Sequence, residues 1–114
     1  MNVVDPQIVS TTVTPPRADY ELIVPDELYF LQGHFPDRPV LPGVVQIHWA
    51  VELAKSSLGL DAAFKGIEAL KFHRIIEPQT PLRLTLELAT ATGKLLFSYQ
   101  SDVGVCSQGR ILFE

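Results

Sequence analysis

The apolar residues between Pro42 and about Leu60 recur at spacings of three and four, which is the period of an amphipathic α-helix. Proline near the first turn and Gly59 near the end are typical of helix boundaries. We expect the main apolar stripe to contain Val44, Ile47, Val51, Ala54 and Leu58, with further apolar surface from Val45, Trp49, Ala50 and Leu53. Apolar residues on this much of the helix circumference predict that other parts of the chain cover more than one side.

The rest of the chain follows the period of two that is typical of β-strands. Residues 82–89 alternate strictly, with leucines on one face and Arg83, Thr85 and Glu87 on the other. Other strands are predicted near residues 8–13, 18–24, 66–74, 95–103 and 105–113, and a short apolar segment lies at 28–31. The links between the later strands are too short for crossover helices, so the sheet should be antiparallel. The predicted fold class is α+β, with a curved antiparallel sheet around one long central helix.

Length and composition indicate one folded domain. A chain of 114 residues with 46% hydrophobic and 19% charged residues has enough apolar material for a core and too little charge for disorder. We expect a single domain over residues 1–114, with residues 1–16 as a peripheral N-terminal arm. The formal net charge of −4 argues against nucleic acid as a partner, because no overall basic field would attract phosphates.

Several sequence features predict a cytoplasmic protein without membrane insertion. Cys106 is the sole cysteine, so no intrachain disulfide is possible, which fits a reducing compartment. The first 16 residues lack the basic start and continuous apolar run of a signal peptide. No apolar run approaches the ~20 residues that a membrane-spanning helix needs.

A proline-rich segment leads into the predicted helix and carries a histidine. Prolines at positions 36, 39 and 42 restrain the backbone, so residues 35–41 should form a stiff, non-helical arm. His34 lies at one end of this arm, and the helix begins at the other. An imidazole that is held beside a helix entrance is a candidate functional group.

Residues 33–44, Gly-His-Phe-Pro-x-x-Pro-x-x-Pro-Gly-Val, resemble the signature of the (3R)-hydroxyacyl-acyl carrier protein dehydratases, the FabZ-like and FabA-like enzymes. Residues 66–74 and 81–88 are similar to the two strands that follow the helix in that family, so the resemblance spans roughly residues 18–113. The chain also resembles the FabZ-like dehydratases that are associated with aryl polyene pathways.

The resemblance implies a hotdog fold and an assembly that is at least a dimer. Each active site would lie at the subunit interface and use the histidine of one chain with a helix carboxylate of the other. The resemblance further implies an acyl carrier protein as partner, with the substrate on its phosphopantetheine arm, and no cofactor or metal of the enzyme's own.

The sequence departs from this family at the acidic position of the helix. Fourteen residues after His34, where the family has a carboxylate, this chain has His48, and the nearest carboxylate is Glu52, one turn later. A second departure is Asp37, where the family usually has a small residue.

Dehydration of a 3-hydroxyacyl thioester needs a base, a donor for the enolate-like oxygen and an acid for the leaving hydroxyl. His34 is the predicted base, because a neutral imidazole accepts protons near neutral pH. No capping side chain precedes the helix and Pro42 has no N–H, so Gly43, Val44 and Val45 carry the first free donors. We assign the thioester oxygen to the Gly43 N–H, with Val44 as alternate donor. The alternative is that water caps this end and Gly43 only relieves crowding.

The acid is assigned to His48, either as an imidazolium that protonates the hydroxyl or as a group that binds a water. Glu52 is one helical turn away and would support His48 by orienting it or by raising its pKa. The alternative is that His48 marks lost or altered chemistry and that Glu52 is a solvated charge. A metal held by His34, His48 and Glu52 is disfavoured, because His73 lies in a strand pattern and Cys106 is remote.

Two further sets of residues complete the predicted site. Candidates to bind the acyl chain, which could equally be core residues, are Phe35, Pro42, Val44, Val45, Trp49 and Phe72. Candidates to contact the acidic carrier protein are Lys71 and Arg74, although basic residues at a strand end are often simply solvated. The predicted function is dehydration to the trans-2-enoyl thioester. The alternatives are a hotdog thioesterase, in which a carboxylate such as Glu52 directs water, and a non-catalytic carrier-binding subunit.

Overall fold

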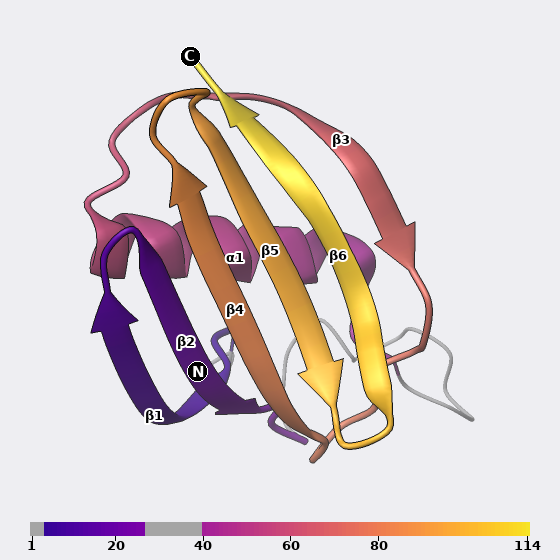
Figure 1. The fold of residues 1–114 in the computed structure, drawn as a ribbon. Coiled ribbons are helices and arrows are strands. Elements are labelled where there is room, and N and C mark those ends of the chain that lie inside the picture. Colours follow the sequence, from indigo (N-terminus) through magenta and orange to yellow (C-terminus); the bar gives the residue numbers. More distant parts are fainter. Residues whose placement is uncertain (1–3, 27–39) are drawn as a thin grey trace.

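Figure 1 shows the computed structural model of the chain, which describes residues 4–26 and 40–114. The described residues form one six-stranded antiparallel sheet in the order β1-β2-β4-β5-β6-β3, with helix α1 (Gly43–Leu58) against one face. The strands are β1 (Gln7–Thr14), β2 (Arg17–Ile23), β3 (Phe64–Phe72), β4 (Pro81–Ala89), β5 (Lys94–Ser101) and β6 (Gly104–Phe113). The sheet curves around the helix, which confirms the predicted α+β hotdog arrangement.

The elements lie close to the segments that the sequence pattern predicts. The strand expected near residues 8–13 is β1, which pairs with β2 at one edge of the sheet and is exposed along its whole length. The other edge is β3, which pairs with β6. The apolar segment at residues 28–31 lies outside the described residues.

The core lies between the sheet and the helix. In β4, Leu82, Leu84 and Leu86 are buried, whereas Arg83 and Glu87 are exposed, as the strict alternation predicts. These leucines join inward-facing residues of β2, β5 and β6, which include Ala18, Tyr20, Leu22, Leu95, Phe97, Tyr99 and Ile111. One face of the sheet is therefore buried and apolar, and it packs against one side of the helix.

The prediction of the main helix stripe is only partly correct, because Ile47, Val51 and Leu58 pack against the core but are only partly buried, and Val44 is exposed. The buried residues of α1 are Val45, Gln46, Trp49, Ala50 and Ala54, and only the last belongs to the stripe that we expected. Val44 is 74% exposed, and Ile47 and Val51 are partly buried. Apolar residues occur on both sides of this helix, so their spacing alone does not identify the side that faces the sheet. The large Trp49 ring fills space there, while the small alanines allow the helix to approach closely.

The ends of α1 follow from local sequence. Pro42 occupies the N-cap in an extended conformation (φ −61°, ψ 145°), and no side chain caps this end. At the other end, Gly59 adopts the left-handed conformation (φ 67°) that commonly terminates helices. Within the described ranges, no helix has the length and hydrophobicity required to cross a membrane.

Candidate active site

The first peptide groups of α1 are held in a fixed direction. The Pro42 carbonyl accepts hydrogen bonds from the N–H groups of Val45 (3.1 Å) and Gln46 (3.2 Å). Because a trans peptide is planar, the N–H of Gly43 points opposite to that carbonyl, out of the helix end. Among residues 4–26 and 40–114, no hydrogen bond reaches the N–H of Gly43 or Val44. The N–H groups of Gly43 and Val44, which the sequence predicts as donors, are therefore unpaired in this part of the chain. The N–H of Val45, which the sequence also predicts to be free, instead donates to the Pro42 carbonyl.

A hollow of about 380 Å³ lies beside this helix start. One wall comes from the helix entrance and the other from the end of β3 and the residues after it; the lining residues are Val40, Leu41, Pro42, Gly43, Gln46, Phe72, His73, Arg74 and Ile75. The structure thus brings four of the predicted site residues, Pro42, Gly43, Phe72 and Arg74, around one space.

Phe72 lies directly against the helix entrance. A Cβ atom at Gly43 would come within 2.5 Å of Phe72 Cζ, although this ring is itself 51% exposed. Glycine therefore permits close contact between the ring and the first helical residue. The chain after Phe72 is held by two further hydrogen bonds, since the N–H groups of His73 and Arg74 both donate to the Cys106 carbonyl (2.8 and 3.1 Å).

Sequence reasoning missed a buried polar cluster below the helix entrance. Gln46 is 4% exposed, and its side chain bonds both Ser107 of β6 and the Leu41 carbonyl. The Tyr99 hydroxyl donates to the backbone carbonyl of Gln46 at 2.6 Å, and burial raises the pKa of this phenol. The sequence signal for this cluster is Gln46 itself, a polar residue between the apolar Val45 and Trp49. It is informative only when the buried side of the helix is known, because only then is Gln46 recognised as a buried polar residue.

The predicted acid lies on the opposite side of α1. Val44, His48 and Glu52 follow one another at intervals of four residues, and all three are exposed. Within the described part of the chain, no hydrogen bond or ion pair joins His48 to Glu52, and His48 does not line the hollow. In those same residues, no group of three or more His, Cys, Asp and Glu side chains is placed to hold a metal ion. His34 and Phe35 lie outside the described residues.

Two predicted acyl-binding residues belong to the core. Val45 is 4% exposed and Trp49 is 2% exposed, and neither lines the hollow. The indole Nε1 of Trp49 donates to the Val4 carbonyl (3.0 Å), which fastens the chain before β1 to the helix. In this structure, the two side chains therefore contact other core residues, and their acyl-binding role stays a prediction.

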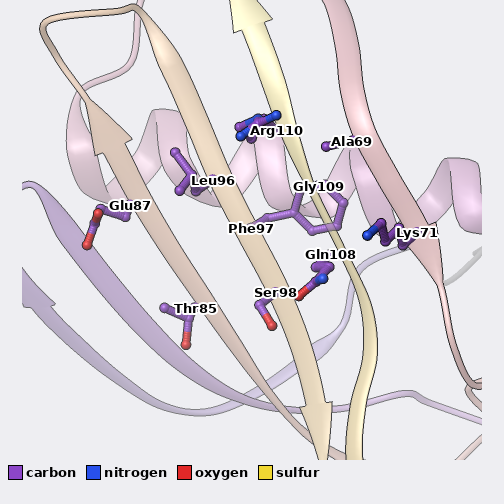
Figure 2. A pocket seen from close by; sticks show the side chains of 10 residues that line it. All are labelled: Ala69, Lys71, Thr85, Glu87, Leu96, Phe97, Ser98, Gln108, Gly109 and Arg110. Atoms are coloured by element: carbon purple, nitrogen blue, oxygen red, sulfur yellow. The ribbon is translucent and has the colours of Figure 1, made fainter.

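The two predicted carrier contacts line different hollows. Lys71 lines a hollow of about 360 Å³ on the outer face of the sheet, the face directed away from α1. Figure 2 shows this hollow, which Arg110, Glu87 and seven other residues also line. Arg74 instead lines the hollow beside the helix entrance. Neither of these two hollows, as the described residues line them, contains both Lys71 and Arg74.

Ion pairs neutralise part of the charge on the outer face of the sheet. Glu68 accepts a hydrogen bond from Lys94 Nζ (2.7 Å) and pairs with Arg110 Nε (3.0 Å). The hydrogen bond from Lys94, and to a smaller extent Arg110, holds the pKa of Glu68 below its usual value.

Comparisons with known proteins identify the family and the fold to which this chain is similar. The sequence model of the ApeI-like family, described as ApeI dehydratase, matches residues 10–110. The chain is 38% identical over 73 residues to 3-hydroxyacyl-acyl carrier protein dehydratase FabZ of Natranaerobius thermophilus, covering 58% of this chain and 51% of that protein. FabZ of Acetivibrio thermocellus is 33% identical over 94 residues, which cover 74% of this chain and 64% of that protein. The chain thus spans about half the length of the first relative and somewhat more of the second.

A solved structure matches the whole fold. A chain of the dehydratase heterocomplex ApeI:P from Xenorhabdus doucetiae superposes with a TM-score of 0.87 at 32% identity, covering 95% of this chain and 96% of that one. The similarity therefore extends over both edge strands of the sheet and over the helix that packs against one face of it.

Proposed function

This chain belongs to the ApeI-like dehydratase family, and on that premise we propose that it dehydrates 3-hydroxyacyl thioesters on an acyl carrier protein to trans-2-enoyl thioesters. The pathway would be fatty acid or polyene-type biosynthesis. One observation carries the proposal: the N-terminus of α1 has no side-chain cap and borders a hollow that can receive a thioester.

The helix entrance supplies the electrostatic part of the reaction. When the proton next to the thioester carbonyl leaves, negative charge develops on the carbonyl oxygen. The Gly43 N–H, with Val44 as alternate donor, stabilises this charge together with the positive end of the helix dipole. A donor that is already oriented before the substrate arrives needs no reorganisation during the reaction, which is why such sites are effective.

Two imidazoles would carry the proton transfers. His34 removes the proton from C2, and the electrons left behind form the C2–C3 double bond as the C3–O bond breaks. His48 gives a proton to the departing hydroxyl, so that water leaves and the enoyl thioester remains. Glu52, on the same exposed line of the helix, is the group that would support His48.

The exposed position of His48 argues for an assembly. Its side chain lies away from the hollow of its own chain, so a joint site needs the hollow of another subunit. We propose that the protein functions as at least a dimer, either with a second copy or with a related subunit, as in the heterocomplex of the ApeI:P structure. Arg74, at the rim of the hollow, is the better placed of the two candidate contacts for the acidic carrier protein.

The direct test is incubation of the purified protein with 3-hydroxyacyl carrier substrates that carry alkyl, polyene and aryl-polyene chains. We expect formation of the trans-2-enoyl product without release of free carrier thiol, and loss of this activity in His34→Ala. Thiol release without enoyl product would instead identify a thioesterase. If no substrate of any chain type is dehydrated, the proposal is wrong.

A second candidate function is that of a non-catalytic subunit that binds the carrier protein or a catalytic partner. The observation that favours it is the replacement of the family's helix carboxylate by His48, whose imidazole has no hydrogen-bond partner among the described residues. Carrier binding that persists in a protein without dehydratase activity would support this candidate.

A further inference from the structure

A buried chain of hydrogen bonds connects the sheet to the peptide that precedes α1. The Ser107 hydroxyl donates to Gln46 Oε1 (2.7 Å), and Gln46 Nε2 donates to the Leu41 carbonyl (3.1 Å). Gln46 is 4% exposed and Ser107 is fully buried. A backbone carbonyl can only accept, so the amide nitrogen must face Leu41 and the amide oxygen must face Ser107. The Gln46 side chain is therefore fixed in one orientation.

The peptides on either side of Pro42 are held by this arrangement. The N–H of Leu41 donates to the Ile76 carbonyl (2.7 Å), while its C=O is held by Gln46. The ring of Pro42 fixes φ, and the Pro42 carbonyl accepts from Val45 and Gln46. Together these contacts determine the direction of the next N–H, which belongs to Gly43.

We propose that Gln46 is a positioning residue for the oxyanion donor. Its side chain holds the Leu41 carbonyl, and through the rigid Leu41–Pro42–Gly43 backbone it aims the Gly43 N–H. The inference rests on the proposed function for its catalytic consequence, but not for the geometry itself. A leucine at position 46 would fill similar space among the core residues, so the amide serves the hydrogen bonds rather than packing.

The test compares Gln46→Leu with Tyr99→Phe as a matched control. Gln46→Leu removes two buried side-chain hydrogen bonds and Tyr99→Phe removes one. The Tyr99 hydroxyl donates to the backbone carbonyl of Gln46 (2.6 Å), so Tyr99→Phe leaves the side-chain amide of Gln46 untouched. Removing an oxyanion donor costs ~100- to 1,000-fold in kcat. We expect a displaced donor in Gln46→Leu to lower kcat by about ten- to a hundredfold with KM almost unchanged. Tyr99→Phe should keep kcat while its Tm falls.

A second readout separates this inference from the proposed function. Amide ¹⁵N relaxation of Gly43 should show a rigid backbone in the parent, with an order parameter of about 0.85, and a lower value in Gln46→Leu. Tyr99→Phe should retain the parent value. If the parent shows no dehydratase activity, the proposed function fails, and the Gly43 amide still decides whether Gln46 orders the helix entrance.

Ser107→Ala guards against the case in which Gln46→Leu fails to fold. It removes only the hydroxyl that orients the amide, so we expect a smaller change of the same sign in both kcat and Gly43 order. Folded variants of Gln46 and Ser107 with parental kcat and a rigid Gly43 amide would overturn the inference. Equal losses in Tyr99→Phe would also overturn it, because the effect would then follow from general loosening of the core.

Discussion

The two sides of α1 have different surroundings, although the residues of both sides are interleaved along the same sixteen-residue helix. On the sheet side, Val45 and Trp49 are 4% and 2% exposed. On the other side, Val44 and His48 are exposed, at positions directly before each of those two residues. The first side packs against the sheet of the same chain and forms part of its core. The second side carries the proposed acid and is completed, in our proposal, by another subunit.

The largest difference should appear between Trp49→Ala and His48→Ala in urea unfolding. Truncation of a buried tryptophan costs about 3–5 kcal/mol, and here the hydrogen bond to the Val4 carbonyl is lost as well. An exposed histidine should change the free energy of unfolding by less than about 0.5 kcal/mol. A similar cost for both variants would contradict the assignment of the two sides.

The adjacent valines give a closely matched comparison. Val45→Ala removes two buried methyl groups and should cost about 2 kcal/mol of unfolding free energy. Val44→Ala removes the same groups from a side chain that is 74% exposed, so within a single subunit the change should stay below about 0.5 kcal/mol.

Denaturation at several protein concentrations sharpens this comparison. A protein whose subunits associate through the Val44 side should lose stability in Val44→Ala only at concentrations at which the assembly forms. The cost of Val45→Ala should not depend on concentration. A concentration-independent penalty of about 2 kcal/mol in Val44→Ala would show that its side chain is buried within one subunit.

Gly43→Ala distinguishes crowding from catalysis at the helix entrance. The added methyl group would meet the Phe72 ring, so the ring must move and the hollow changes shape. We expect kcat/KM to fall about tenfold, equivalent to ~1.4 kcal/mol, with little change in Tm. If Gly43→Ala with Phe72→Leu restores full activity, the glycine serves only to accommodate the ring.

The smallest effect is expected on the outer face of the sheet, at the ion pairs of Glu68. Its pKa is held below the ordinary 4.5 chiefly by the hydrogen bond from Lys94. The folded state therefore favours the carboxylate, and the stabilisation is complete above about pH 4.5 and disappears as pH falls through the lowered folded pKa. Glu68→Gln should flatten the stability profile below pH 4.5 and leave the slope at neutral pH unchanged. A steeper acid profile in Glu68→Gln would contradict this.

Local patterns predict the elements of this fold well. The strict alternation of residues 82–89 identifies both β4 and the inward direction of its leucines. Pro42 marks the start of α1 because proline fixes φ, and Gly59 marks its end because glycine readily adopts the left-handed conformation. The motif around Gly43 likewise identifies the helix entrance, which the structure places beside a hollow.

Features that depend on distant contacts were not predictable in this way. Ser107 lies 61 residues after Gln46, and only the folded sheet brings the two side chains together. The choice between the two apolar sides of α1 likewise depends on how Trp49 fits against the sheet. The roles of His34 and Phe35 stay predictions, since the described residues do not include them.

In our proposal, the exposed side of α1 takes part in catalysis through His48. The most direct measurement is the rate of enoyl-thioester formation by the parent, His48→Glu and His48→Ala, with equal stability verified by urea unfolding. We predict that His48→Ala loses about a hundredfold in kcat, as expected for removal of a general acid, and that His48→Glu retains activity. A parental rate in His48→Ala would contradict the claim. Equal inactivity of all three proteins with intact carrier binding would instead identify a non-catalytic subunit.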